Sequence, residues 1–193
     1  MKIFKFGGAS VKDAQAVRNV SKIVKEHGER PLLVVISAMG KTTNHLEALI
    51  KARQNQESLT ALATTLKEQH LQIINDLGFQ KDNTLIDYIS SQIAAMQERL
   101  EAAEISNETY DRVYDETIHI GELISTKIVT SWMQQEGLPA QWVDARTCVK
   151  TDDRHREAKI DWVLTRQKVT EEVKPQLAEH ILVTQGFIAS NQA

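Results

Sequence analysis

The sequence predicts an α/β fold in which a mainly parallel sheet is interrupted by a large helical insert. Residues 3–6 form a short β-favouring run that two glycines end, and a helical pattern follows over 11–27. Residues 32–36 are consecutive apolar residues, which is typical of a strand buried on both faces of a parallel sheet. Over 44–137 the apolar residues recur almost entirely at helical spacing. The order strand, helix, strand therefore opens the chain and an insert follows.

The first turn, at Gly7 and Gly8, is a candidate anion site. Glycine lets a backbone approach a ligand closely, and N–H groups ahead of a helix suit a phosphate. Lys5 and Ser10 flank the turn and would add a charge and a hydroxyl group. The stretch matches neither the common phosphate loop nor the dinucleotide motif. An ordinary tight strand–helix turn is the alternative.

A second turn of the same kind, residues 37–44, follows the second strand directly. It is small and polar, contains Gly40, and precedes a helix. In a parallel sheet both turns lie at the carboxyl edge, where doubly wound folds bind ligands. The agreement favours a ligand site, although both turns would also suit the geometry of the fold alone.

The insert is expected to hold four helices. The first begins near Asn44, and the second covers 59–77 and ends at Gly78. Asp82 or Asn83 is expected to cap the third, and Ser106 or Asn107 the fourth, which runs to Gly137. The charged side chains of these helices are interpreted as solvated faces.

Gly121 and Glu122 stand inside the fourth of these helices. Glycine within a helix costs roughly 1 kcal/mol relative to alanine, so we expect a group to pack closely against the backbone at Gly121. On a helical wheel Glu122 lies about 200° from the apolar Ile120, on the face of Ser125. Spacing alone therefore favours a solvent-exposed glutamate.

Three further elements are expected after the insert: a strand at 141–143, a helix at 165–177 that Pro175 bends, and a strand at 180–184. Asp144 and Arg146 are interpreted as an ion pair that fixes a loop. Cys148 is expected to be a partly buried small hydrophobe without thiol reactivity. The polar loop 151–155 contains two aspartates and a histidine, but their spacing does not favour a metal site.

Composition narrows the function classes. The chain has 193 residues, of which 41% are apolar and 25% charged, as is ordinary for a globular protein. A net charge of −3 argues against a general nucleic-acid binder. One cysteine and the absence of a signal-peptide pattern favour the cytoplasm. No apolar run approaches the length of a membrane span.

In order along the chain, the motifs resemble those of the aspartate kinases. They are Lys5-Phe-Gly-Gly-Ala-Ser10, Ser37-Ala-Met-Gly-Lys-Thr-Thr-Asn44, Gly121-Glu-Leu-Ile-Ser125, Asp144-Ala-Arg146 and Thr184-Gln-Gly-Phe-Ile188. The resemblance covers the chain from end to end. It implies an αβα sandwich of the amino-acid-kinase type, and phosphorylation of the β-carboxylate of L-aspartate by ATP with Mg²⁺. The product, 4-phospho-L-aspartate, leads to lysine, threonine, methionine and diaminopimelate.

The resemblance also implies roles for individual residues. Lys5 would be catalytic, at the transferring phosphates, where Gly7, Gly8 and Ser10 would also bind. Ser37, Thr43 and Glu122 would hold aspartate, and no residue is expected to bind a metal. The β-carboxylate of aspartate, with an ordinary pKa of about 3.9, is already ionised at neutral pH and needs no general base. Catalysis then consists of positioning the substrates and neutralising the charge of the phosphoryl group.

Two departures from the family pattern stand out. Ala9 replaces the usual threonine, and the sequence ends at Ala193. Residues 1–193 are therefore expected to form the N-terminal, amino-acid-binding lobe of the catalytic domain, without its nucleotide-binding half or the regulatory ACT domains. We expect such a chain alone to have little or no kinase activity, and the full-length protein to be a homo-oligomer.

Two alternatives remain. One is a relative of the same fold that phosphorylates glutamate or acetylglutamate. The other is an inactive fragment whose helices over 44–137 serve as a binding or dimerisation module. The Gly121-Glu-Leu-Ile-Ser125 motif and the long insert favour aspartate.

Overall fold

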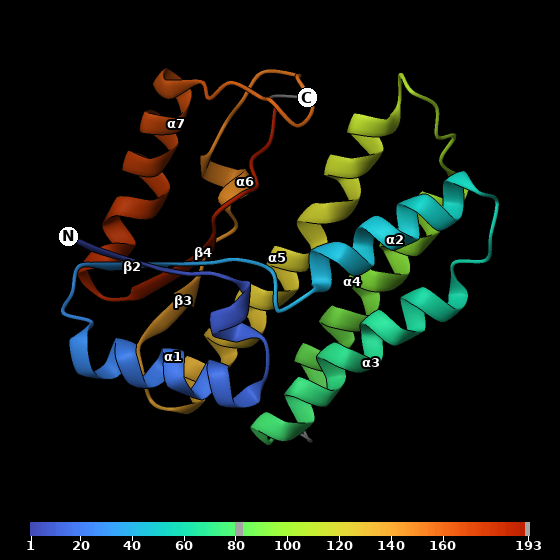
Figure 1. Ribbon diagram of the computed structural model, residues 1–193. Coiled ribbons are helices and arrows are strands. Elements are labelled where there is room, and N and C mark those ends of the chain that lie inside the picture. The colour runs from blue at the N-terminus through green and yellow to red at the C-terminus, as the bar shows by residue number, and fades with distance from the viewer. Residues whose placement is uncertain (80–82, 192–193) are drawn as a thin grey trace.

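The core of the fold is a sheet of four parallel strands. The computed structural model describes residues 1–79 and 83–191. The strands lie in the order β1 (Lys2–Phe6), β2 (Leu32–Ile36), β4 (Ile181–Gln185) and β3 (Ala140–Trp142). Lys5 pairs with Val35, which pairs with Thr184. The carboxyl ends of β1, β2 and β4 therefore meet at one edge of the sheet (Figure 1).

Helices cover the sheet on both faces, so the predicted αβα sandwich is confirmed. One layer holds α1 (Ala14–His27) and α5 (Tyr110–Gln135), and the other holds α6 (Ala145–Cys148), α7 (Trp162–Lys168), the π turn η2 (Val169–Val173) and the 3₁₀ turn η3 (Lys174–Ala178). Val34 and Val183 pack with the first layer, and Leu182 with the second. The second layer packs on Leu182 of β4 and Leu33 of β2 but not on β1, where Ile3 is 57% exposed.

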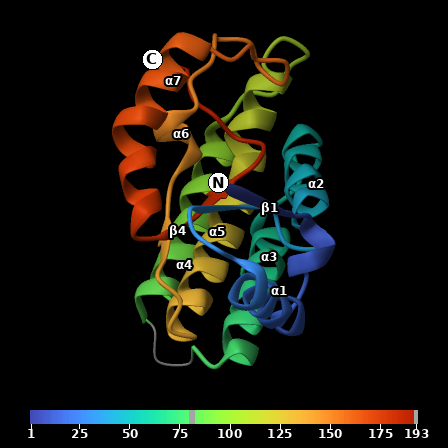
Figure 2. The same cartoon turned by 90° about the vertical axis from the view of Figure 1, so that its left-hand side faces the viewer.

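The insert consists of α2 (Thr42–Gln54), α3 (Thr60–Leu77) and α4 (Asn83–Ala102), together with α5. Figure 1 shows α2, α3 and α4 gathered on one side of the molecule, with α5 running from them to the sheet. Figure 2 shows the same bundle from the side of the sheet. A single apolar core continues from the strands through α5 into these helices. The predicted cap Asp82 lies outside the described residues.

Because α5 packs against the sheet and against the other helices, residues 120–126 are all buried. The expectation that Glu122 is exposed to solvent is therefore wrong. A wheel drawn from one apolar stripe assumes that the opposite face meets water. Here the opposite face of α5 meets the turns that follow β2 and β4.

Side chains that cap the backbone explain why some helices begin elsewhere than predicted. The first helix begins at Ala14, because Asp13 Oδ1 accepts the Ala16 N–H at 2.8 Å, and residues 8–11 form a separate 3₁₀ turn. The fourth begins at Tyr110 with Thr109 at its N-cap position and no capping side chain, so the prediction of Ser106 or Asn107 as the cap is wrong. Ser106 Oγ instead accepts the N–H groups of Glu108 and Thr109, in the turn before the helix.

The last helix differs more from the prediction of 165–177. It begins at Trp162, because Asp161 Oδ1 accepts the N–H groups of Val163 and Leu164 at 3.0 and 2.9 Å. The α-helix then ends at Lys168 and continues as the π and 3₁₀ turns, the second of which contains Pro175. Proline has no N–H group to donate, so an unbroken α-helix would lose a hydrogen bond there.

Candidate functional site

The two predicted turns lie side by side at the carboxyl edge of the sheet. The Ser37 N–H donates to the Phe6 carbonyl at 3.1 Å, and the Gly40 N–H donates to the Gly8 carbonyl at 3.0 Å. These bonds extend the pairing of β1 and β2 past the strands. The juxtaposition inferred from sequence is confirmed, and each turn fixes the other.

The two glycines of the first turn have different environments. A Cβ atom on Gly8 would lie 2.7 Å from the Ala38 carbonyl oxygen, so the second turn leaves no room for a side chain there. A Cβ atom on Gly7 would meet no described atom within 4 Å, and Gly7 has φ of −76°, which any residue adopts. Packing therefore explains Gly8 but not Gly7, which stands open to an approaching ligand.

The second turn is clamped by α5. A Cβ atom on Gly121 would lie 3.0 Å from both Ala38 Cβ and Thr42 Cγ2, so the helix backbone touches the turn. The Ser125 hydroxyl donates to the Ser37 carbonyl at 2.7 Å. The prediction that a group packs closely against Gly121 is confirmed, and it is the turn of residues 37–44 that does so.

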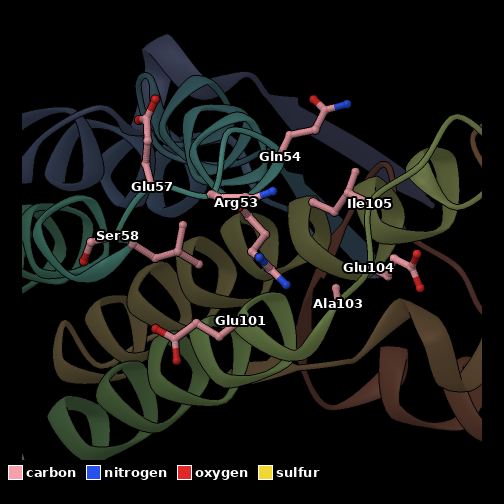
Figure 3. A pocket seen from close by; sticks show the side chains of 10 residues that line it. Arg53, Gln54, Glu57, Ser58, Glu101, Ala103, Glu104 and Ile105 are labelled. Atoms are coloured by element: carbon pink, nitrogen blue, oxygen red, sulfur yellow. The ribbon is translucent and has the colours of Figure 1, made fainter.

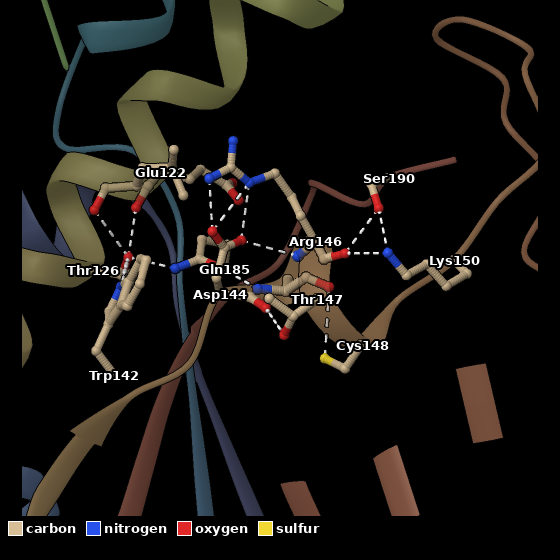
Figure 4. Close-up of polar contacts among 12 residues, drawn as sticks. Glu122, Thr126, Trp142, Asp144, Arg146, Thr147, Cys148, Lys150, Gln185 and Ser190 are labelled. Carbon is tan, nitrogen blue, oxygen red and sulfur yellow. Dashed lines mark hydrogen bonds and ion pairs between the residues drawn. The ribbon is translucent and has the colours of Figure 1, made fainter. Parts of the chain in front are cut away.

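Glu122 follows Gly121 and is 7% exposed. Its Oε2 atom accepts the N–H groups of Gly186 and Phe187, at 3.0 and 2.9 Å, just after β4 (Figure 4). No described residue donates to its Oε1 atom. Burial raises the pKa of the Glu122 carboxyl group, while the Phe187 and Gly186 N–H groups and the positive charge of Lys5 act in the opposite direction.

The other predicted site residues surround this carboxylate more loosely. Lys5 is exposed near the carboxyl end of β1, close enough for its charge to act on Glu122. Ser10 is exposed in the 3₁₀ turn, where its N–H donates to the Gly7 carbonyl. Ser37 follows β2 directly and Thr43 lies in the first turn of α2, both partly buried. The fold thus brings both predicted groups, phosphate-binding and substrate-binding, to one edge.

Below Glu122 lies a polar network to which the sequence analysis gave no role. Gln185 donates through Nε2 to Thr126 Oγ1 at 2.7 Å and accepts the Ala145 N–H on Oε1 at 2.7 Å. Trp142 Nε1 donates to the same hydroxyl at 2.8 Å (Figure 4). Gln185 belongs to the Thr184-Gln-Gly-Phe-Ile188 motif, which is the feature of the sequence that could have identified it. The network fixes the end of β4 against α5 and α6.

The predicted ion pair is confirmed: Arg146 Nη2 lies 2.6 Å from Asp144 Oδ2. Asp144 also accepts the Arg146 N–H and so caps α6. The Lys150 ammonium group and the Ser190 hydroxyl group both donate to the Arg146 carbonyl. These bonds tie the end of the described chain to this short helix. Cys148, predicted to be partly buried, is buried almost fully, and burial raises the pKa of its thiol.

The polar loop 151–155 is held by bonds within itself and by bonds to the segment after β4, where the Thr151 N–H donates to the Ser190 carbonyl at 2.9 Å. Asp152 Oδ1 accepts the N–H groups of Arg154 and Lys159, at 3.3 and 2.9 Å. Across residues 1–79 and 83–191 there is no cluster of three or more histidine, cysteine or acidic side chains that would hold a metal. Within the same residues, no helix combines the length and apolarity needed to span a bilayer.

A hollow of about 520 Å³ lies elsewhere, between the carboxyl-terminal ends of α2 and α4 (Figure 3). Arg53, Glu57, Glu101 and Glu104 are among its lining residues. None of the predicted site residues lines it, and the sheet edge adjoins the opposite end of α2. The hollow is therefore separate from the candidate site.

Comparisons with known proteins find relatives over almost the whole chain. The model of the amino acid kinase family matches residues 1–193. The bifunctional aspartokinase/homoserine dehydrogenase 2 of Escherichia coli is 30% identical over 193 residues, which are 99% of this chain and 23% of that protein. The lysine-sensitive aspartokinase 3 of the same organism is 30% identical over 188 residues, 97% of this chain and 40% of that protein.

Solved structures give the same result. E. coli aspartokinase III in complex with lysine and aspartate superposes with a TM-score of 0.87 at 29% identity, and its complex with aspartate and ADP with 0.85 at 28%. Each comparison covers 98% of this chain and 41% of the other. The chain thus spans less than half the length of these relatives.

Proposed function

We propose, because this chain belongs to the amino acid kinase family, that it is the amino-acid-binding part of an aspartate kinase. The proposed reaction is transfer of the γ-phosphoryl group of ATP, carried with Mg²⁺, to the β-carboxylate of L-aspartate. The aspartokinase relatives are more than twice as long as this chain, and we propose that their additional length includes the nucleotide-binding half. The cytoplasmic location and homo-oligomeric state expected from the sequence stay predictions.

One observation carries the proposal: Glu122 is a buried carboxylate with one oxygen engaged and the other unengaged by the described residues. A buried carboxylate is costly unless it is paired. The α-ammonium group of an amino acid would supply the missing partner at Oε1. Ser37 and Thr43, on the adjoining turn, would donate hydroxyl groups to the substrate.

The chemistry at the other end of the site suits a phosphoryl group. The substrate carboxylate is already ionised at neutral pH, so no general base is needed. Phosphoryl transfer then depends on positioning and on neutralising charge. Lys5 would supply a cation, Ser10 a hydroxyl group, and Gly7 and Gly8 backbone N–H groups.

Aspartate binding can be tested by thermal unfolding of the chain. A ligand at about a hundred times its Kd stabilises by about 2.7 kcal/mol, which raises Tm by about 5–10 °C in a chain of this size. We expect L-aspartate to produce such a rise and succinate, which lacks the ammonium group, to produce almost none. The variant Glu122→Gln should lose the response to aspartate.

Glu116→Gln is the matched control, because Glu116 is an exposed glutamate on the same helix, paired with Arg112. It should keep the full aspartate response. An equal rise in Tm for wild type and Glu122→Gln would contradict the proposed ammonium site.

The two alternatives give other outcomes in the same experiment. Stabilisation by glutamate or acetylglutamate in preference to aspartate would identify a different acceptor in the same site. The aspartokinase relatives favour aspartate. Indifference to every amino acid, combined with concentration-dependent association, would support a helical binding or dimerisation module. ATP-dependent formation of aspartyl hydroxamate by this chain alone would refute the expectation that it has little kinase activity.

A further inference from the structure

A buried histidine of the insert contacts the start of the helix that follows the second turn. His70, on α3, is 1% exposed. Its Nδ1 atom lies 2.8 Å from the Leu66 carbonyl oxygen and its Nε2 atom 3.2 Å from Thr42 Oγ1. A carbonyl oxygen only accepts, so Nδ1 carries the proton in this pair. Burial lowers the pKa of His70, so the ring is neutral and Nε2 accepts the Thr42 hydroxyl proton.

Thr42 connects this histidine to the candidate site. Its Cγ2 methyl group lies against Gly121, the residue before Glu122. Its N–H donates to the Met39 carbonyl at 2.9 Å and closes the turn. Thr43, a predicted substrate ligand, follows directly. One buried side chain therefore touches the turn, α5 and, through its hydroxyl, α3.

We propose that His70 is a positioning residue for the amino-acid site, acting through the Thr42 hydroxyl. The inference rests on the proposed function, which assigns Ser37, Thr43 and Glu122 to the substrate. By accepting the Thr42 proton, His70 fixes the side-chain rotamer that places the Thr42 methyl group on Gly121. That contact sets the distance between the turn and α5, and hence between Thr43 and Glu122. The insert would thereby control how well the site is formed.

Two amide variants distinguish the roles of the two ring nitrogens of His70. In His70→Gln the side-chain amide reaches the place of Nε2 and can still accept from Thr42. In His70→Asn the shorter amide lies near the place of Nδ1 and can serve only the Leu66 carbonyl. We expect His70→Gln to bind L-aspartate within about twofold of wild type and His70→Asn about tenfold more weakly, as loss of one buried hydrogen bond gives. His70→Leu should behave like His70→Asn.

Amide hydrogen exchange gives a readout that does not require aspartate to bind. The Thr42 N–H should exchange about tenfold faster in His70→Asn than in wild type and nearly as slowly in His70→Gln. Thr42→Val should weaken aspartate binding like His70→Asn, and the double variant Thr42→Val/His70→Leu no further.

The outcomes separate the two proposals. If aspartate binds neither wild type nor any variant, the proposed function fails. The exchange rates of the Thr42 N–H then still decide whether His70 positions Thr42. Equal exchange rates in the Gln and Asn variants, or additive losses in the double variant, would overturn the positioning role.

Discussion

The two glycines of the first turn lead to opposite expectations for the same substitution. In Gly8→Ala the new Cβ atom would stand 2.7 Å from the Ala38 carbonyl oxygen. The shortest usual carbon–oxygen contacts in proteins are about 3.3 Å, so the two turns would have to separate by roughly 0.6 Å. The carbonyl belongs to the backbone and is held by the clamp from α5, so it cannot rotate away. Overpacking of this kind costs roughly 1–3 kcal/mol.

Gly7→Ala has no such clash. The added methyl group meets no described atom within 4 Å, and the residue already has a common φ of −76°. A tolerated glycine-to-alanine change stabilises by about 0.4–1 kcal/mol through the unfolded chain. The net difference in the free energy of unfolding between the two variants is then about 1.5–4 kcal/mol, in favour of Gly7→Ala.

Urea denaturation with linear extrapolation resolves a difference of this size, and thermal unfolding should separate the two variants by several degrees. Gly7→Ala nonetheless should weaken nucleotide binding to the full-length protein, because its methyl group would occupy the space proposed for phosphate. Equal stability of the two variants, or greater loss for Gly7→Ala, would refute the packing argument. Unchanged nucleotide affinity in Gly7→Ala would refute the proposed phosphate site at this residue.

Three further predictions concern the buried polar groups. Burial raises the pKa of Glu122, so the folded chain is more stable with Glu122 protonated and loses this stability as pH rises through that pKa. Glu122→Gln, which stays neutral, should therefore be more resistant to urea than wild type at about pH 7, with a smaller gain at about pH 4. Thr126→Val should cost about 2–4 kcal/mol in urea unfolding, since the Trp142 and Gln185 donors lose their acceptor, whereas Thr126→Ser should be nearly neutral. Cys148, whose pKa burial raises, should react with iodoacetamide slowly in the native chain and quickly in urea; equal rates would contradict its burial.

The layers of the fold follow from local sequence signals. The apolar run of β2 and the helical spacing of the insert do not depend on distant contacts, and both were predictable. The element boundaries depended on single capping side chains. With Asp161 as its cap, α7 begins at Trp162, three residues before the predicted start at 165. Thr165 is also a residue type that caps helices, so the sequence did not single out Asp161. A cap is recognisable only once the following backbone is known to be helical.

The candidate site divides in the same way. The two glycine turns were predictable because parallel strands place their carboxyl ends together. The burial of Glu122 was not, because it depends on β4, whose following residues donate to the carboxylate from more than sixty positions away along the chain. Periodicity reports one apolar stripe of a helix. It cannot report that the other face of α5 is also covered.

The hydrogen bonds of Glu122 determine how its variants should be interpreted. Glu122→Ala would remove the carboxylate proposed for the substrate and also leave the Gly186 and Phe187 N–H groups without their acceptor. The loop after β4 would then be free to move, and any loss of binding would have two causes. Glu122→Gln keeps an acceptor oxygen for the loop, but it replaces the second, negatively charged oxygen by an NH2 group that cannot accept from an ammonium group. A loss of aspartate binding in the glutamine variant, with the loop amides still protected from exchange, therefore assigns the effect to the second carboxylate oxygen, Oε1.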